Sequence, residues 1–191
     1  MKQRIVVGVS GASGMPLAVE VLRQLRACPD VETHLVLSRA AEITLREESE
    51  LTAEQLRALA DVCHDNADIG AAPASGSFPA AGMIVVPCSM KTVAGIVTGY
   101  SDSLLLRAAD VTLKERRKLV LAVRECPFST LHLRNMQELS AMGAVILPMM
   151  LSFYNHPKNL EDCLRHLAGK ILDQFGLEGQ GFRRWQGRQA P

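Results

Sequence analysis

The sequence has no excess charge of either sign and no long hydrophobic run. Its 21 lysine and arginine residues are balanced by 20 acidic residues, which leaves a formal net charge of +1 at pH 7. Proteins that bind nucleic acid or an anionic membrane surface through electrostatics carry a basic field, so neither partner is expected. No apolar run approaches the roughly 20 residues that cross a bilayer. The composition therefore excludes these two classes of partner.

Paired cysteines and clustered histidines are also missing. The five cysteines are odd in number, and no Cys-x-x-Cys pair occurs. They are Cys28, Cys63, Cys88, Cys126 and Cys163. This spacing argues against a disulfide framework and a zinc knuckle, and it predicts buried, reduced thiols. The five histidines show no metal-ligand spacing, so no metal site is predicted.

The N-terminal residues do not have the pattern of a signal peptide. Lys2 and Arg4 precede an apolar stretch that covers only residues 5–7 before Gly8, whereas the apolar region of a signal peptide has about 7–15 residues. Together with the reduced cysteines, this predicts a cytoplasmic protein.

Short β-rich runs alternate with longer helical patterns along the chain. A length of 191 residues, with 48% hydrophobic and 21% charged residues, fits one domain with a real core. Strands are predicted over 4–9, 31–37, 83–87, 119–123 and 144–147. Helices are predicted over 16–27, 39–47, 52–61, 92–97, 104–113, 130–142 and 160–175. The segment 63–81 is predicted to be mostly loop, with one edge strand as the alternative.

This alternation predicts an α/β fold. Strands that alternate with helices indicate parallel pairing with right-handed crossovers. The uninterrupted apolar run at 83–87 is typical of a strand covered on both faces, so we expect an open, mostly parallel sheet with helices on both sides. Such sheets bind ligands beyond the carboxyl ends of their strands, and the residues that follow each strand are the candidates for a site.

Small, hydroxylated or cationic residues follow four of the predicted strands. They are the Ser10–Gly14 loop, Ser38, the Ser89–Thr92 segment and Arg124. Small residues let a ligand approach the backbone, and helix starts offer free N–H groups to an anion. Each segment taken singly is equally explained by a turn, a helix cap or an Arg124–Glu125 salt bridge. Together they favour a planar ligand that carries a phosphate, although the glycines do not have the dinucleotide-binding spacing.

A series of motifs occurs in order between Ile5 and about Trp185. They are Gly11–Gly14 (GASG), Ser38, Pro73–Ser77 (PASGS), Pro87–Thr92 (PCSMKT), Arg107–Val111 (RAADV), Leu113–Arg117 (LKERR), Arg124-Glu125, His132-Leu133 with Asn135-Met136, and Phe153-Tyr154. As a set they strongly resemble the UbiX-type flavin prenyltransferases. Within that family the resemblance is strongest to the branch that is associated with the phenolic acid (hydroxyarylic acid) decarboxylases.

The resemblance implies a fold, a reaction and partners. The fold is a Rossmann-like, flavodoxin-like three-layer sandwich over residues 1–191, with a C-terminal helix and tail from about residue 157 completing the site. The reaction joins a dimethylallyl group from dimethylallyl phosphate to N5 and C6 of reduced FMN, which is itself a substrate, and uses no metal. The product, prenylated FMN, is delivered to a UbiD-type decarboxylase of aromatic acids. The assembly is a homo-oligomer, a dodecamer, with sites at subunit interfaces.

The resemblance also implies site residues. Those that match the FMN-binding positions are Gly11, Ala12, Ser13, Ser38, Ser89, Met90, Lys91, Thr92 and Arg124. Those that match the positions around dimethylallyl phosphate are Tyr154, Lys170, Lys114 and Arg124.

Four residues are predicted to act in catalysis. Ser13, beside the flavin N5, is expected to orient or relay a proton, and Glu48 is expected to receive the proton lost on ring closure. Lys114 is expected to stabilise the departing phosphate together with the other cations, and Tyr154 to donate a hydrogen bond to it. The structural alternatives are a packed aromatic for Tyr154 and solvated helix charges for Lys170 and Glu48.

The sequence departs from the family's pattern in two places. Residues 149–152 (MMLS) stand where a proline usually comes shortly before the Phe-Tyr pair, and Ile69-Gly70 stands where some members carry a tryptophan that faces the isoprenoid. The second departure predicts slower prenyl transfer.

Two other functions remain open. One is a flavin-dependent cysteine decarboxylase of the same superfamily, and the other is a non-catalytic FMN-binding component of a decarboxylase complex. Prenyl transfer is favoured over both, because a phosphate leaving group needs the cations and the hydroxyl that Lys114, Lys170 and Tyr154 offer, whereas neither alternative does.

Overall fold

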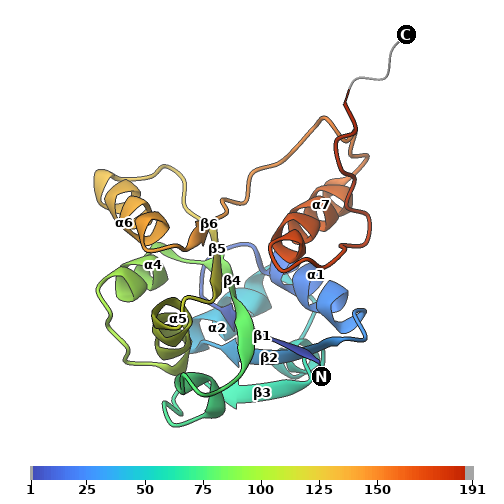
Figure 1. Ribbon diagram of the computed structural model, residues 1–191. Coiled ribbons are helices and arrows are strands. Elements are labelled where there is room, and N and C mark those ends of the chain that lie inside the picture. The colour runs from blue at the N-terminus through green and yellow to red at the C-terminus, as the bar shows by residue number, and fades with distance from the viewer. Residues whose placement is uncertain (1, 188–191) are drawn as a thin grey trace.

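A parallel sheet of six strands lies between two layers of helices in the computed structural model, which describes residues 2–187 (Figure 1). The strand order is β3-β2-β1-β4-β5-β6. The strands are β1 Gln3–Val9, β2 Val31–Leu37, β3 Val62–Asp65, β4 Ala80–Cys88, β5 Lys118–Val123 and β6 Val145–Ile146. The helices are α1 Met15–Arg26, α2 Arg39–Glu48, α3 Ala53–Arg57, α4 Met90–Val97, α5 Leu104–Lys114, α6 Thr130–Ala141 and α7 Leu160–Asp173, with a 3-10 turn at Ala72–Ala74. The predicted three-layer α/β fold is confirmed.

The edges of the sheet differ most from the prediction. The segment 63–81, predicted to be mostly loop, overlaps the edge strand β3, which pairs with β2 in parallel and bears out the alternative. The strand predicted over 144–147 is reduced to the two residues of β6. Leu147 still donates its N–H to the carbonyl of Leu121 at 2.9 Å, so the pairing weakens gradually at this edge.

Two helices also have different ends from those predicted. The helix predicted from residue 92 begins two residues earlier, because the Ser89 hydroxyl accepts the Thr92 N–H at 3.3 Å and caps the first turn. The helix predicted over 52–61 ends at Arg57, and by Asp61 the chain has joined β2, since the N–H of Asp61 donates to the carbonyl of Thr33 at 3.2 Å and its carboxylate accepts the N–H of Thr33 at 2.8 Å. No helix in the described part of the chain is long and apolar enough to span a bilayer.

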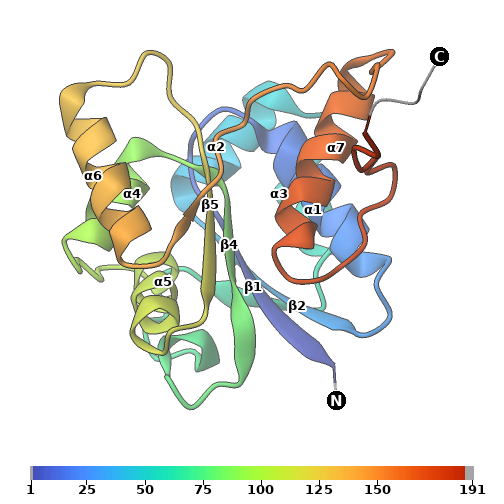
Figure 2. The same ribbon diagram turned by 45° about the horizontal axis from the view of Figure 1, so that its top comes forward.

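Each face of the sheet has its own hydrophobic core. In β1, Ile5 and Val7 pack with α1 and α7, whereas Val6 packs on the other face with α4, α5 and α6. In β4, Ile84 belongs to the first core and Met83 to the second. Figure 2 shows α1 and α7 on one side of the sheet and α4, α5 and α6 on the other. Burial on both faces explains why the central strands are apolar along their whole length.

The strand order reverses at β1. From β1 the chain goes outward to β2 and β3 and then crosses back to β4, which lies on the other side of β1. Open α/β sheets bind ligands in the crevice that such a reversal creates at the carboxyl ends of the strands. The loops that follow Val9 and Cys88 border this crevice, so the fold places the predicted small-residue and hydroxyl segments side by side.

Replacing Ile84 by alanine is expected to lower the free energy of unfolding by about 2–5 kcal/mol, because a fully buried side chain of the central sheet leaves a cavity. The matched control is Ile43→Ala, the same change at a side chain that is 56% exposed, where we expect a change within about 0.5 kcal/mol. Urea unfolding followed by circular dichroism, at equal protein concentration, measures both. Equal losses in the two variants would contradict the placement of β4.

Candidate functional site

The loop after β1 passes close to α2, and this explains its small residues. A Cβ added to Gly11 would lie 2.4 Å from the Cβ of Ala40, in the first turn of α2. Gly14 has a φ of 118°, a conformation that residues with a side chain rarely adopt. Glycine is therefore required at both ends of the GASG segment, at Gly11 by close packing and at Gly14 by the backbone conformation.

Ser10 joins this loop to the loop after β4. Its hydroxyl donates to the carbonyl of Pro87 at 2.8 Å and accepts the N–H of Ser89 at 2.8 Å. Ser10 itself is only 3% exposed. The two loops that border the crevice are thus fixed relative to each other by a buried hydroxyl.

Glu48, at the end of α2, reaches the start of α1. Its Oε2 accepts the N–H of Gly14 at 2.8 Å and that of Met15 at 3.0 Å. No side chain of its own N-cap residue caps α1, so Glu48 supplies the missing acceptor and places a negative charge at the positive end of the helix dipole. The alternative of a solvated helix end describes the exposed Glu47 and Glu50, but it is wrong for Glu48.

These contacts hold Glu48 in its ionised form. Burial by itself raises the pKa of Glu48, but hydrogen bonds from the Ser13 hydroxyl and from the N–H groups of Gly14 and Met15, with the charge of Arg124, outweigh it. The net effect is a pKa below the ordinary value. The site therefore carries a carboxylate beside Ser13 at neutral pH.

Hydroxyls cap α2 and α4, two of the helices that start at this edge. Ser38 accepts the N–H of Ala41 at 3.1 Å at the start of α2. At the start of α4, Ser89 accepts the N–H of Thr92, and the two hydroxyls are 3.0 Å apart. The interpretation of Ser38 and Ser89 as helix caps is confirmed. A capping hydroxyl keeps its own O–H donor, so capping does not prevent these serines from binding a ligand.

Two cations lie at the same edge without a partner carboxylate. Lys91, in the first turn of α4, and Arg124, after β5, are both exposed. The N–H of Arg124 donates to the carbonyl of Cys88 at 3.0 Å, which holds Arg124 beside the loop after β4. In the described part of the chain neither cation forms an ion pair, so the Arg124–Glu125 salt bridge is not present.

The groups at this edge fit the chemistry of FMN. A phosphate requires N–H donors and positive charge, which the starts of α2 and α4, Lys91 and Arg124 offer. The hydroxyls of Ser38, Ser89 and Thr92 are suited to a polyol chain. No group of three or more His, Cys, Asp or Glu side chains among the described residues has the geometry to hold a metal ion.

An apolar hollow opens beside Ser13 and Glu48. It has a volume of about 440 Å³ and lies between α1, α7 and the segment 149–151. The residues that line it are Ser13, Gly14, Pro16, Leu17, Glu48, Met149, Leu151, Leu160, Leu164 and Leu167. A hydroxyl and a carboxylate at the rim of an apolar hollow suit a small ligand with one reactive, polar end.

Tyr154 lies on the segment between β6 and α7, where it contacts a buried histidine. Its hydroxyl and Nε2 of His166 are 3.1 Å apart, and the His166 residue is only 2% exposed. Burial and the nearby charge of Lys170 lower the pKa of His166, so the ring is neutral at pH 7. His166 was not predicted. Its spacing of four residues from Lys170, on the same face of a helix, was the available signal.

Lys170 is exposed near the end of α7, with Nζ 5.9 Å from the ring centre of Phe182. Tyr154, His166 and Lys170 thus form one group, which we call the α7 group. Tyr154 does not line the hollow beside Ser13. The packed-aromatic alternative accounts for only part of Tyr154, which remains 47% exposed.

The structure separates Lys114 from the other predicted site residues of the same chain. Lys114 ends α5 and pairs with Glu115 close to Gly76, just before β5 begins at Lys118. Arg124 follows the opposite end of β5. Six strand residues at about 3.3 Å each separate the two edges by about 20 Å. Within a single chain Lys114 therefore does not lie beside Arg124, and its predicted role at the phosphate stays a prediction.

Comparison with known proteins identifies the family. The family model described as Flavoprotein matches residues 1–169. A probable UbiX-like flavin prenyltransferase from Sedimentibacter hydroxybenzoicus is 52% identical over 184 residues, which cover 96% of this chain and 97% of that protein. The chain belongs to the UbiX-like flavin prenyltransferases. The predicted family is thereby confirmed.

Solved structures of UbiX-like proteins have the same fold over nearly the whole chain. The crystal structure of a dodecameric FMN-dependent UbiX-like decarboxylase from Escherichia coli O157:H7 has a TM-score of 0.94 and 53% identity, and covers 97% of this chain and 100% of that one. The crystal structure of AnUbiX (PadA1) in complex with FMN and dimethylallyl pyrophosphate has a TM-score of 0.96 and 49% identity. The match covers 99% of this chain and 100% of that one. The FMN-dependent cysteine decarboxylase TvaF has a TM-score of 0.67 at 14% identity, which shows a shared fold alone.

Glu48→Gln is expected to destabilise this UbiX-like chain by about 1 kcal/mol at pH 7, because the amide keeps an acceptor for the start of α1 but loses the charge. The pKa of Glu48 is lower in the folded state than the ordinary value of about 4.3. Its stabilisation is therefore complete above that value and is lost as the pH falls through the folded-state pKa. The difference in Tm between wild type and variant should be present at pH 7 and shrink below about pH 4.

The control for this comparison is Glu47→Gln, which removes the same charge from an exposed neighbour and should leave Tm unchanged at both pH values. A difference between wild type and Glu48→Gln that grew on acidification would show that Glu48 is protonated in the folded state.

Proposed function

We propose that this chain transfers a dimethylallyl group from dimethylallyl phosphate to N5 and C6 of reduced FMN and releases prenylated FMN. The observation that carries the proposal is the Glu48 carboxylate, fixed by the N–H groups of Gly14 and Met15 at the rim of the apolar hollow that Ser13 also lines, where the strand order reverses. Membership of the UbiX-like flavin prenyltransferases supports it. So does the AnUbiX structure, which contains FMN and dimethylallyl pyrophosphate.

We propose that the whole chain, residues 1–191, is one flavoprotein domain, in which the segment from about residue 157 completes the site. The residues that hold FMN are Gly11, Ala12, Ser13, Ser38, Ser89, Met90, Lys91, Thr92 and Arg124. The reduced flavin supplies the two ring atoms that form the new bonds, and no metal takes part. The protein aligns the donor with these atoms in a site with little water.

Cleavage of the donor's allylic C–O bond produces a phosphate and a delocalised cation. Arg124 and Lys170 stabilise the phosphate, and Tyr154 donates a hydrogen bond to it. The Glu48 carboxylate faces the developing positive charge, and the Ser13 hydroxyl, which lines the same hollow as Glu48, relays the proton lost on ring closure. Removal of one such contact typically costs about 10²–10³ in rate.

Lys114 can join this set only from a second copy of the chain, because its own copy holds it at the opposite edge of the sheet. An assembly that brings the start of β5 of one protomer against the carboxyl edge of another would supply it. The dodecameric homologue from Escherichia coli supports an assembly of this kind, and we propose a dodecamer here.

We propose that the recipient of the product is a UbiD-type decarboxylase of aromatic acids, and that the chain belongs to the branch associated with the phenolic acid decarboxylases. The alternative is an FMN-binding component without activity. A carrier would not need the α7 group, and this group therefore favours the enzyme. The exposed Ile69, where some family members have tryptophan, offers no aromatic surface to the allyl cation and is consistent with slower transfer.

Incubation of the purified protein with reduced FMN and dimethylallyl phosphate, without a decarboxylase, is expected to increase the mass of the flavin by one C₅ unit and change its absorbance. The pyrophosphate donor should be tested in parallel. A flavin that binds but keeps its mass with both donors would contradict the proposal and favour the carrier.

The hydrogen bond between Tyr154 and His166 predicts coupled effects on this reaction. Tyr154→Phe should lower the rate of prenyl transfer about 100-fold by removing the phosphate contact. His166→Leu should lower it about tenfold, mainly as a higher KM for the donor, because it frees the tyrosine hydroxyl from its fixed orientation. The double variant should be no slower than Tyr154→Phe. Additive losses would show that His166 acts independently of Tyr154 and is not a positioning residue.

A further inference from the structure

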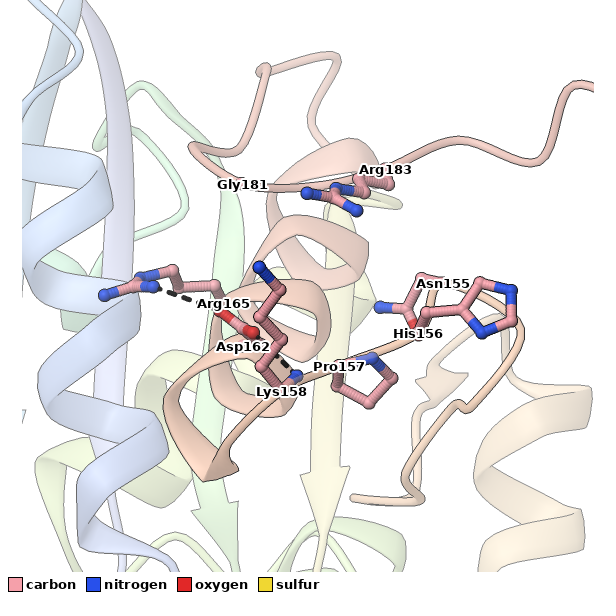
Figure 3. Close-up of a pocket in the computed structure, with 8 residues that line it drawn as sticks. All are labelled: Asn155, His156, Pro157, Lys158, Asp162, Arg165, Gly181 and Arg183. Carbon is pink, nitrogen blue, oxygen red and sulfur yellow. Dashed lines mark hydrogen bonds and ion pairs between the residues drawn. The ribbon is translucent and has the colours of Figure 1, made fainter.

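A second pocket lies at the start of α7, apart from the loops that border the crevice. It has a volume of about 290 Å³ (Figure 3). Its lining comes from the loop 155–158, from Asp162 and Arg165 of α7, and from Gly181 and Arg183 of the C-terminal tail. None of these residues is among the residues proposed to hold FMN or belongs to the α7 group.

Positively charged donors dominate this pocket. Lys158, Arg165 and Arg183 bring three positive charges against the single negative charge of Asp162, in a chain whose total charge is only +1. Neither Lys158 nor Arg183 forms an ion pair with any residue that the structure describes. Figure 3 shows Lys158 on the loop side of the pocket and Arg183 on the tail side. Two cations from segments far apart in sequence therefore share one concave space.

Asp162 does not neutralise these two cations. Its Oδ2 accepts the backbone N–H of Lys158 at 2.9 Å, and its Oδ1 accepts a hydrogen bond from Arg165 at 3.3 Å. Both carboxylate oxygens are thus used to fix the loop and to orient Arg165. The ammonium of Lys158 and the guanidinium of Arg183 remain available to a ligand.

Asn155 adds an uncharged donor. Its Oδ1 is buried and has no hydrogen-bond partner among the residues that the structure describes, and its amide nitrogen is a donor. Figure 3 shows this nitrogen turned toward α7. The lining therefore offers N–H donors from three segments, while its one carboxylate is already occupied.

We propose that this pocket binds a phosphate group. Ammonium and guanidinium donors arranged around one space recognise a tetrahedral oxyanion through charge-assisted hydrogen bonds. The volume leaves room for a phosphate with several waters, since one water takes up about 30 Å³. The site is separate from that of the FMN phosphate and does not depend on prenyl transfer. Its ligand is either free phosphate or the phosphate of a small ester, because both present the same oxygens.

The test is calorimetric titration of inorganic phosphate into the full-length protein saturated with FMN, at low ionic strength. Saturable binding is expected. The double variant Lys158→Gln/Arg183→Gln should weaken it at least about tenfold, because it removes both unpaired cations. Arg184→Gln is the matched control: it removes the same charge from the adjacent residue, which pairs with Asp173 at 2.6 Å outside the pocket. This variant should bind phosphate as the wild type does.

Asp162→Asn provides a change in the opposite direction. The amide oxygen can still accept the N–H of Lys158, but the negative charge is gone, so phosphate should bind about three- to fivefold more tightly. Titration with a phosphate monoester in place of phosphate then identifies the source of the ligand, the tighter binder being the one preferred. Absence of saturable binding would overturn the proposal. So would equal weakening by Arg184→Gln and the double variant, which would show general charge attraction only.

Discussion

The start of α1 has no capping side chain of its own, and the organisation of the site depends on how Glu48 fills that gap. Glu48 comes from the far end of α2, and its carboxylate accepts the N–H groups of Gly14 and Met15. The same carboxylate lies with Ser13 at the rim of the apolar hollow, so it fixes the loop after β1 at the point where that loop borders the hollow. Removing this acceptor would release the helix start and the serine at once. Structural and chemical roles coincide in one residue.

This contact also limits what Glu48 can do chemically. A carboxylate whose pKa is lowered is a weaker base than an ordinary one, because donors already stabilise its charge. The same donors make it a fixed negative charge, which can stabilise a developing allyl cation without reorganisation. In the proposed reaction, this favours electrostatic stabilisation of the cation as the main contribution of Glu48. Because Glu48 is then a weak base, it can take up a proton through Ser13 only from a strongly acidic donor.

Local patterns in the sequence predict the sheet well, and they also identify the residues that gather at its carboxyl edge, since strand alternation and the residues after each strand are properties of neighbouring positions. The contacts of Glu48 and His166 are different in kind. Glu48 acts on Gly14 from 34 positions away, and His166 looks like any histidine on a helix until Tyr154 is placed beside it. Lys114 fails within one chain for the converse reason, because similarity of sequence does not record which protomer supplies a residue. The contacts of Glu48 and His166 and the position of Lys114 all depend on how elements far apart in the sequence are placed in space.

The segment that carries Tyr154 shows why the chain alone does not complete the proposed site. Phe153 is 70% exposed, Met150 65% and Trp185 61%, and large apolar side chains grouped in this way usually mark a contact with another protein surface. The neighbouring protomers of the proposed dodecamer are the natural cover. Contact of a neighbouring protomer with these apolar side chains would fix the path of the segment and therefore the position of Tyr154. The same interface would bring Lys114 of another copy to the donor. Assembly and completion of the site are then coupled, because Arg124 and Lys170 are held by their own chain, whereas Tyr154 and Lys114 depend on contacts between protomers.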